Sequence, residues 1–548
     1  MKKYIGHLLL IVLIGLIGFP QIASAEETSE RVIIGFENEI ETTILEDSSH
    51  QLIHTYEPID AISVSVEKDV LEELRANPKV KWVEKDRKVK ATRQVRNWGF
   101  DATNTNASRD LQINGNGTKV AVIDTGINRD HPDLDVAGGA NFVGDGTSYE
   151  DDNGHGTHVA GVINAQNNSY GTLGVAPAAK LYAVKSLDSE GIGNEADVIA
   201  GIQWAIEKDV DIINLSLTSP YSSTALKKMI DRAHAKGIFV VAASGNDKTG
   251  DGQLTEDVMY PGRYDNVISV GAVTEDLKKA KFSYQGKSLD FVAPGSQIYS
   301  TYIERNDSEY AYLSGTSMAS PYVAGALALY KQLYPELSFD ELEAVLMNNA
   351  DDLGRPGRDD VYGDGLVQSP VSYFTDVENE DWFLNYVNDL TRKEWIQGYP
   401  DYTFRPQNKI TRQEVVTLIG RSLDLDGTKR STDYSDVNQY HYGSGFIDSA
   451  TDKGIVEGFR DGTFRPDESM RRGDVALIIY RAFDIPTSNE HFFEDVNRDR
   501  YYSEAIHSLA KEGIINGYNG TEFRPEQPIT RAEFATILSR TINPELRS

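Results

Sequence analysis

From Lys119 onward, short and almost continuously apolar segments alternate with segments of helical period, and this alternation restricts the fold more than any other feature. The predicted strands span residues 119–123, 181–185, 210–217, 238–243 and 267–273, with predicted helices at 197–208 and 223–236. Strands without a polar face, joined by helices, indicate an α/β fold with a doubly wound parallel sheet covered on both faces. Sites in such sheets form at the carboxyl ends of the strands.

One candidate residue directly follows an apolar segment, and another opens a helix. Asp124 directly follows the predicted strand 119–123, where a carboxylate either needs a partner or forms an ordinary turn. His155 opens a predicted helix in a glycine-rich segment and lies three residues before His158, as in a metal pair. The glutamate of an H-E-x-x-H zinc site is missing. We therefore predict that His155 is a general base and that His158 is a packed neighbour.

Two further residues complete the candidate site. Asn246 follows the predicted strand 238–243, and its amide either faces a developing oxyanion or forms a turn. Ser317 lies in 315–321, at the head of an apolar helix over 322–330, and Pro321 fits the first helical turn. At the positive end of a helix dipole, a free Ser317 hydroxyl suits a nucleophile, and the alternative is an N-cap serine.

The order Asp124, His155, Asn246 and Ser317 resembles that of the subtilisin family of serine proteases, over about residues 94–367. The motifs are Val122-Ile123-Asp124-Thr125-Gly126, His131-Pro132-Asp133-Leu134, His155-Gly156-Thr157-His158-Val159-Ala160-Gly161 and Gly315-Thr316-Ser317-Met318-Ala319-Ser320-Pro321. The resemblance implies a catalytic domain at 93–370 that hydrolyses peptide bonds in proteins and peptides. Ser317 would attack the carbonyl, His155 would transfer its proton, and Asp124 would orient His155. Asn246 would hold the oxyanion with the Ser317 backbone N–H.

The same resemblance implies a calcium ion. The segment 166–177 is similar to the family's calcium-binding loop, and the implied ligands all present oxygen, as Ca²⁺ prefers. The side chains of Gln94, Asp133 and Asn168 would bind it. Carbonyl groups would come from Gln166, Tyr170 and Thr172. The alternative is an ordinary Asn-rich surface loop.

The N-terminal residues predict export. Residues 1–25 combine Lys2 and Lys3, an apolar core over 8–19 and a small-residue cleavage site at 23–25, as a secretory signal does. The alternative is a membrane anchor, for which the apolar run is short. The chain has no cysteine, which excludes disulfides and fits an exported bacterial protein. Its formal net charge of -30 argues against nucleic acid as a partner.

Residues 26–92 predict a small α+β domain. Strands are expected at 31–36, 61–66 and 80–84, with an amphipathic helix at 69–76 and a basic stretch at 85–96. In front of a protease, this unit resembles the subtilisin propeptide, which assists folding and then inhibits the enzyme. It implies an autoprocessed zymogen whose own propeptide is an intramolecular inhibitor.

The C-terminal part is periodic. Phe404-Arg405-Pro406 recurs as Phe464-Arg465-Pro466 and Phe523-Arg524-Pro525, at offsets of 60 and 59 residues. Each unit is predicted to contain two helices around a glycine-rich loop, and the second helix opens with Thr411-Arg412-Gln413-Glu414 or its counterparts. Thr411 and Glu414 fit a capping box. The counterpart in the second unit, Arg471-Arg472-Gly473-Asp474, departs from this pattern.

These units resemble three S-layer homology repeats, at 373–430, 431–489 and 490–548, which would form an all-α domain. Such repeats bind anionic secondary cell-wall polysaccharide at the bacterial cell surface. Arg412, Arg472 and Arg531, at the mouths of grooves, would pair with its carboxylates.

Three classes of function remain for the whole chain. The first is a secreted, wall-attached serine endopeptidase, made as a zymogen. The second is a non-catalytic surface protein with a retired protease fold, and the complete set of candidate residues argues against it. The third is an autolysin that the repeats target to the wall, but the sequence offers no carboxylate or metal hydrolase site for it.

Overall fold

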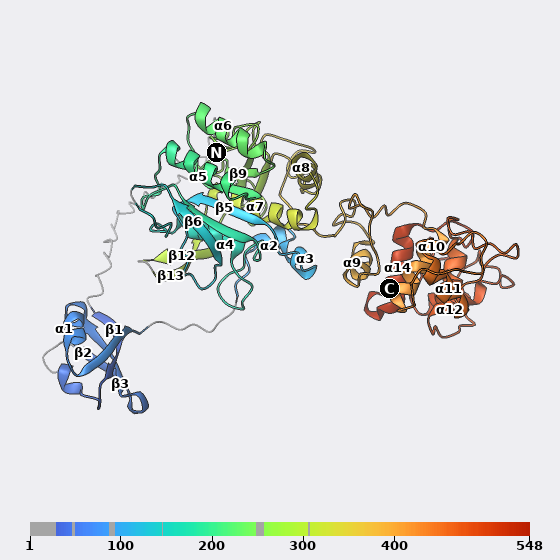
Figure 1. Cartoon of the computed structure of the whole chain (residues 1–548), viewed down its shortest axis with the longest axis horizontal. Coiled ribbons are helices and arrows are strands. Elements are labelled where there is room, and N and C mark those ends of the chain that lie inside the picture. Colours follow the sequence, from blue (N-terminus) through green and yellow to red (C-terminus); the bar gives the residue numbers. More distant parts are fainter. Residues whose placement is uncertain are drawn as a thin grey trace, which may run out of the picture. The chain divides into compact units, whose positions relative to one another are not determined.

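A computed structural model describes residues 29–45, 50–86, 94–144, 146–247, 257–304 and 307–547. The chain forms two compact units, Met1–Ala91 and Thr92–Ser548 (Figure 1). The predicted signal segment and the region of the predicted processing site, 87–93, lie outside the described residues. Within the described part of the chain, no helix has the length and apolar character needed to cross a membrane.

The first unit is a four-stranded antiparallel sheet with one short helix. Its strand order is β2-β3-β1-β4. The elements are β1 (Ser29–Phe36), β2 (His50–Tyr56), β3 (Ala61–Glu67), α1 (Leu71–Ala76) and β4 (Val80–Lys85). Apolar side chains on one face, among them Ile34, Val64 and Leu74, form its core. The α+β class is as predicted, whereas β2 was missed because most of its residues are polar and exposed.

The second unit is organised around a seven-stranded sheet in which every pairing is parallel. Its strand order is β11-β10-β9-β8-β5-β7-β6. The strands are β5 (Lys119–Asp124), β6 (Val136–Asn141), β7 (Lys180–Lys185), β8 (Ile212–Leu215), β9 (Phe239–Ala243), β10 (Ile268–Val273) and β11 (Phe291–Pro294). The strand order reverses direction at β5, so the carboxyl end of β5 is the topological switch point where α/β sheets form sites.

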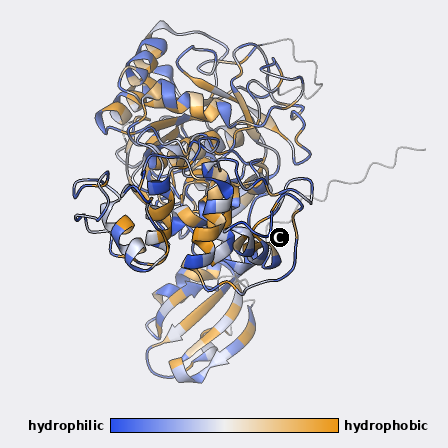
Figure 2. Ribbon diagram, turned by 90° about the vertical axis from the view of Figure 1, so that its right-hand side faces the viewer, coloured by the Kyte–Doolittle hydropathy of each residue, from blue (hydrophilic) through white to orange (hydrophobic). Residues whose placement is uncertain are grey.

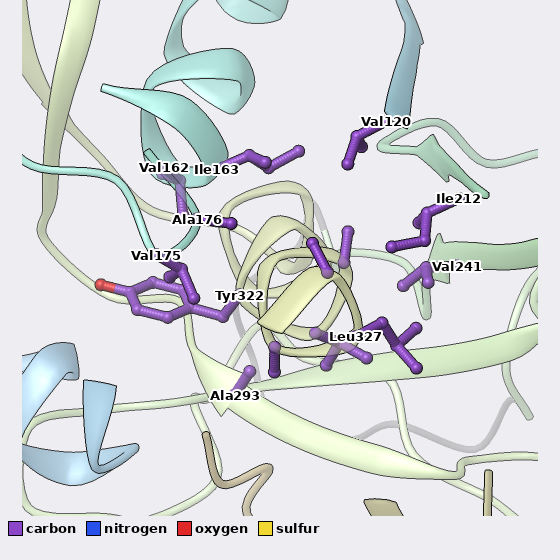
Figure 3. Packing of buried hydrophobic residues seen from close by; sticks show 14 of the residues in the cluster. Val120, Val162, Ile163, Val175, Ala176, Ile212, Val241, Ala293, Tyr322 and Leu327 are labelled. Atoms are coloured by element: carbon purple, nitrogen blue, oxygen red, sulfur yellow. The ribbon is translucent and has the colours of Figure 1, made fainter. Parts of the chain in front are cut away.

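Helices cover both faces of this sheet, as the apolar strands predict. Against one face pack α5 (Glu195–Glu207) and α6 (Thr224–His234), and against the other pack α4 (His155–Asn164) and α7 (Thr316–Leu333). Figure 3 shows α7 end-on, with Val120, Ile212 and Val241 of the sheet on one side and Ile163 of α4 beside it. This core holds α4 and α7, which carry His155 and Ser317, against the same face of the sheet.

Some elements differ from the prediction. The strands β6 and β11 were missed, because β6 is rich in glycine and β11 has only four residues. A hairpin of β12 (Ile298–Glu304) and β13 (Asp307–Leu313) precedes α7 and was also missed. Three further helices are α2 (Gly99–Ala102), α3 (Thr105–Asp110) and α8 (Phe339–Asn348).

The C-terminal repeats each contain two helices, as predicted. They are α9 (Leu384–Arg392) and α10 (Arg412–Ser422), α11 (Ser444–Asp452) and α12 (Arg472–Ala482), and α13 (Ser503–Lys511) and α14 (Arg531–Ile542). The helices have hydrophobic and hydrophilic sides (Figure 2), and the hydrophobic sides merge into one core shared by all three repeats. In every repeat an aspartate accepts hydrogen bonds from the backbone of the Phe-Arg pair, for example Asp376 from Phe404 and Arg405. The recurring aspartates are therefore structural.

Candidate active site

Asp124 is the last residue of β5 and lies at the topological switch point. Its side chain is completely buried, and its Oδ1 accepts a hydrogen bond from the Thr125 backbone N–H (2.8 Å). The Nδ1 atom of His155 lies 2.7 Å from the same Oδ1. The structure thus brings together two residues that the sequence separates by 31 positions.

His155 is the first residue of α4. The preceding Gly154 has φ 100°, a conformation that favours glycine, and a Cβ at this position would lie 2.5 Å from the Tyr302 ring. This glycine lets the chain turn into α4 so that His155 faces the end of β5.

The charge of Asp124 governs the protonation of His155. Burial by itself lowers the pKa of His155. The negative charge of Asp124, the hydrogen bond to it and the charge of Asp151 more than offset this, so the pKa of His155 is raised above its ordinary value. This arrangement stabilises the imidazolium that forms when His155 accepts a proton.

Asp151 and Thr125 hold the two elements together, and sequence reasoning missed both. The buried carboxylate of Asp151 accepts hydrogen bonds from the backbone N–H groups of Asn153, Gly154 and Thr157 at the start of α4. It also accepts one from the Thr125 hydroxyl (2.8 Å), and Thr125 Oγ1 accepts one from the Gly156 N–H (2.9 Å). The available signal was an aspartate four residues before His155, shortly ahead of the predicted helix start.

Ser317 is the second residue of α7, whose N-cap is Gly315. The alternative that Ser317 is itself the N-cap is therefore wrong. Its hydroxyl donates to the Ser216 carbonyl (3.2 Å), and within the described residues it makes no hydrogen bond to His155. Ser317 remains half-buried at the positive end of the α7 dipole.

Pro321 lies one turn later than predicted, as the sixth residue of α7. A proline there lacks the N–H that would have bonded the carbonyl four residues earlier, which belongs to Ser317. The Ser216 hydroxyl takes that place by donating to the Ser317 carbonyl (2.9 Å). Ser216 therefore contacts both the carbonyl and the hydroxyl of Ser317, which the sequence did not indicate.

Asn246 is exposed and lies beside the start of α7. Its Oδ1 accepts hydrogen bonds from the N–H (2.9 Å) and the hydroxyl (3.1 Å) of Thr316. A Cβ on Gly315 would lie 3.4 Å from the Asn246 Nδ2. Among the described residues, this Nδ2 and the Ser317 backbone N–H make no hydrogen bond, so both are available donors on the same side of the helix start.

His158 is completely buried in α4. Its Nε2 lies 3.0 Å from the Ile298 carbonyl and 3.1 Å from the Ala311 carbonyl. Burial lowers the pKa of His158 to about 4, which keeps the ring neutral. These contacts make His158 a packing residue that connects α4 to the β12–β13 hairpin.

Five of the six candidate calcium ligands converge. The Gln94 amide lies 2.7 Å from the carbonyl oxygens of both Gln166 and Thr172. The Asn168 amide lies 2.8 Å from Asp133 Oδ1. The Tyr170 hydroxyl contacts the Pro132 carbonyl, and no contact places the Tyr170 carbonyl with the others among the described residues.

Asp133 is the single carboxylate of this group. It is fully buried, and burial raises its pKa to about 6, although hydrogen bonds from Thr172, Asn168 and Tyr310 oppose the rise. A buried carboxylate that is held only by neutral hydrogen-bond donors, with no ion-pair partner among the described residues, fits a bound cation.

The three candidate wall-binding arginines occupy equivalent positions. Arg412, Arg472 and Arg531 are the first residues of α10, α12 and α14. The predicted capping box is confirmed at Thr411 and Glu414 and recurs at Thr530 and Glu533, whereas Arg471 makes no side-chain cap.

Comparison with known protein families divides the chain into three kinds of segment. Residues 22–92 match the peptidase inhibitor I9 family, and residues 115–365 match the subtilase family. Residues 373–416, 433–476 and 492–535 each match the S-layer homology domain.

Several bacterial proteases are similar to this chain. A thermostable alkaline protease of Halalkalibacterium halodurans is 43% identical over 348 residues, which cover 63% of this chain and 92% of the relative. An alkaline protease of Shouchella clausii is 40% identical over 391 residues, covering 68% and 100%. Subtilisin E of Bacillus subtilis is 38% identical over 378 residues, covering 67% and 97%.

Proposed function

The chain belongs to the subtilase family of serine proteases, and we propose that Asp124, His155 and Ser317 form its catalytic triad. The observation that carries the proposal is the 2.7 Å contact between Asp124 and His155 at the switch point of the sheet. Its direct test is covalent labelling of Ser317 by a serine-directed fluorophosphonate, which a non-catalytic surface protein would not undergo.

The proposed reaction begins when the Ser317 side chain turns from the Ser216 carbonyl toward His155. In free enzymes, catalytic hydrogen bonds often tighten only when substrate binds. His155 accepts the hydroxyl proton as Ser317 attacks the peptide carbonyl, and Asp124 stabilises the resulting imidazolium. His155 then protonates the leaving amine, and water hydrolyses the acyl-enzyme by the same steps in reverse.

We assign the oxyanion hole to the Asn246 Nδ2 and the Ser317 backbone N–H. Because Thr316 holds the Asn246 oxygen, the amide nitrogen is kept beside the nucleophile without rearrangement. Fixed donors of this kind stabilise charge that develops in the transition state.

The Asn246→Asp variant separates the two roles of Asn246, which are to accept hydrogen bonds from Thr316 and to donate one to the oxyanion. It keeps an oxygen for Thr316 but replaces the N–H donor, so kcat should fall at least about 10²–10³-fold, with KM little changed. That magnitude is known for subtilisin, a member of the same family, and is carried over to this chain. Steady-state kinetics on a chromogenic peptide measure it, and a kcat within threefold of the parent would contradict the assignment.

We propose that the chain is a secreted zymogen. Its signal peptide spans 1–25, its propeptide 26–92 and its catalytic domain 93–370. The I9 match supports an inhibitory propeptide, which the enzyme would remove by cutting the basic stretch before residue 94. Protein and peptide chains are the proposed substrates.

We further propose that Ca²⁺ binds between Gln94, Asp133, Gln166, Asn168, Tyr170 and Thr172. Rotation of the Gln94 amide by 180° would turn its oxygen toward the same point as the Gln166 and Thr172 carbonyls. The ion would link the start of the catalytic domain to the loop after α4 and so stabilise both.

Chelation is expected to lower the thermal stability of the Ser317→Ala protein, which cannot digest itself. When the free Ca²⁺ concentration is a hundred times the Kd, the bound ion raises the free energy of unfolding by about 2.7 kcal/mol. Removing the ion with EDTA should therefore lower Tm by roughly 5–10 °C. The Asp133→Asn variant should melt at the lower temperature with or without EDTA. A parent melting curve that EDTA leaves unchanged would exclude the site.

We propose that the three repeats attach the protein to the cell surface by binding secondary cell-wall polysaccharide. The repeats span 373–430, 431–489 and 490–548. The S-layer homology matches support this role. The full chain should be retained on sacculi purified from the producing bacterium, and a chain that lacks residues 374–548 should stay in the supernatant while keeping its peptidase activity. Equal retention of both chains would exclude anchoring by the repeats.

A further inference from the structure

Lys185 is a buried cation that the proposed reaction does not use. It ends β7, where it is paired with Asp124 at the end of the neighbouring parallel strand β5. Its side chain is 7% exposed, and among the lysines of the described segments it alone is buried. Burying an ammonium group is costly unless fixed partners replace the lost water, so its contacts must account for a charge at this position.

Three acceptors from three separate segments hold the ammonium group. The Lys185 Nζ donates to the Thr125 carbonyl (2.7 Å) and to Asp152 Oδ1 (2.7 Å). Its third hydrogen bond, to the Leu187 carbonyl, is 3.0 Å long. A lysine ammonium has three N–H donors, so all of them are used and the group is fixed in one orientation.

The first acceptor belongs to the residue that orients Asp124. The Thr125 N–H donates to Asp124 Oδ1 (2.8 Å), and the same oxygen lies 2.7 Å from His155 Nδ1. Because Lys185 holds the Thr125 carbonyl, it fixes the turn that follows β5. Movement of this turn would carry the Thr125 N–H away from Asp124 and let the carboxylate rotate.

The second acceptor lies in the segment that leads into α4. Asp152 comes three residues before His155, and it follows Asp151, whose carboxylate bonds the backbone N–H groups at the start of α4. Lys185 therefore joins the turn after Asp124 to the turn before His155 through one nitrogen atom. The separation of these two turns sets the distance between the carboxylate and the imidazole.

The third acceptor holds the segment that follows β7. The Leu187 N–H also donates to the Asp124 carbonyl (3.1 Å). Further along this segment, the Ser189 carbonyl accepts a hydrogen bond from the Asn153 amide (2.9 Å). The segment after β7 thus contacts the same two turns, and Lys185 lies where all three segments meet.

A purely stabilising ion pair is the alternative interpretation of this lysine. The Asp152 side chain is 52% exposed, so water competes for it and the pair adds little stability. Replacement of a buried ion pair by apolar residues often leaves stability unchanged or increases it. Stability is therefore a weak reason for a buried lysine here, whereas three directional hydrogen bonds favour a role in fixing geometry.

We propose that Lys185 is a positioning residue for peptide-bond hydrolysis, which holds Asp124 and His155 at hydrogen-bonding distance by fixing the turns that carry them. Among the described residues, its Nζ bonds to no side chain of the triad, so it acts through the backbone of these turns. This inference rests on the proposed triad and adds a residue on which the geometry of proton transfer depends.

The Lys185→Met variant tests the proposal, because it keeps the length of the side chain and removes all three donors. Its kcat on a chromogenic peptide, counted per site that a fluorophosphonate titrates, should fall about 10²-fold with KM little changed, as expected for misplaced reacting groups. Lys180→Met makes the same change at the exposed first residue of β7 and should keep the parent kcat. A parent-like kcat for Lys185→Met would overturn the proposal.

A double-mutant cycle separates positioning from a merely structural role. If Lys185 acts through the contact of Asp124 with His155, Lys185→Met should lower kcat less than about threefold in the Asp124→Asn background, because groups that act as a unit are not additive. A lysine that only stabilised the fold would not depend on that contact. A full loss of about 10²-fold in the Asp124→Asn background would therefore exclude the proposed role.

The Asp152→Ala variant keeps the proposal testable if Lys185→Met does not fold. It removes the acceptor before α4 at a half-exposed position, so the fold should survive while kcat falls about tenfold with KM little changed. Asp130→Ala, the matched control, removes an exposed carboxylate and should retain the parent kcat. Equal kcat values for Asp152→Ala and Asp130→Ala would contradict the positioning role of Lys185.

The outcomes also separate this inference from the proposed triad. If Asp124→Asn keeps the parent kcat, both fail. If Asp124→Asn lowers kcat whereas Lys185→Met and Asp152→Ala do not, the triad stands and the assignment of Lys185 is wrong.

Discussion

The Ser317→Ala variant should accumulate as an unprocessed chain and cleave casein about 10⁶-fold more slowly than the parent. This magnitude is known for removal of the nucleophile in subtilisin and is carried over to this relative. The structural reason is that Ser317 supplies the hydroxyl at the start of α7 and alanine leaves no nucleophile there. The measurements are casein hydrolysis, fluorophosphonate labelling and the intact mass of the secreted protein.

Loss of folding would imitate this result, and the structure provides a check. Ser317 is half-buried, and its hydroxyl makes one hydrogen bond, to the Ser216 carbonyl, so the fold should survive its removal. The variant should therefore show the far-UV circular dichroism of a folded α/β protein and a cooperative thermal unfolding transition. Normal casein cleavage by a folded Ser317→Ala protein would disprove the assignment of the nucleophile.

Much of the catalytic domain was predictable because its signals are local. The apolar residues 120–123 indicated a buried strand, and the strand β5 ends at Asp124, one residue beyond the predicted strand end. A parallel sheet then places such carboxyl ends along one edge, which is why Asp124 was expected in a site. The helix that carries His155 was likewise visible from its glycine-rich start.

The contacts that hold the site depend on tertiary structure, and the sequence pattern did not reveal them. Ser216 and Ser317 are 101 residues apart, and serine is too common for their pairing to be recognised. Pro321 was expected in the first helical turn, and only the structure reveals that the Ser216 hydroxyl takes the place of the missing N–H. The contact of repeat three with repeat one, through Arg531 and Glu414, was equally hidden.

The second large effect is expected for Asp124→Asn, which should lower kcat about 10⁴-fold with little change in KM. Asp124 is completely buried and contacts His155 rather than the substrate, so its loss should act on the proton transfer. Asparagine keeps an oxygen for the Thr125 N–H, and no described residue bonds to Asp124 Oδ2. The Tm should therefore change little, and Asp130→Asn, at an exposed position, should retain full activity.

The pH profile distinguishes this role of Asp124 from a merely structural one. As the proposed base, His155 must be neutral to act, so the acidic limb of kcat/KM should follow its pKa. In the parent, burial lowers that pKa, but the charge of Asp124, the hydrogen bond to it and the charge of Asp151 together raise it by more than burial lowers it. Asp124→Asn removes the charge of Asp124, which is the largest raising contribution, and leaves burial and the charge of Asp151, so the residual activity should persist to lower pH than in the parent. An acidic limb that stays in place would mean that Asp124 does not control His155, and the triad assignment would then fail.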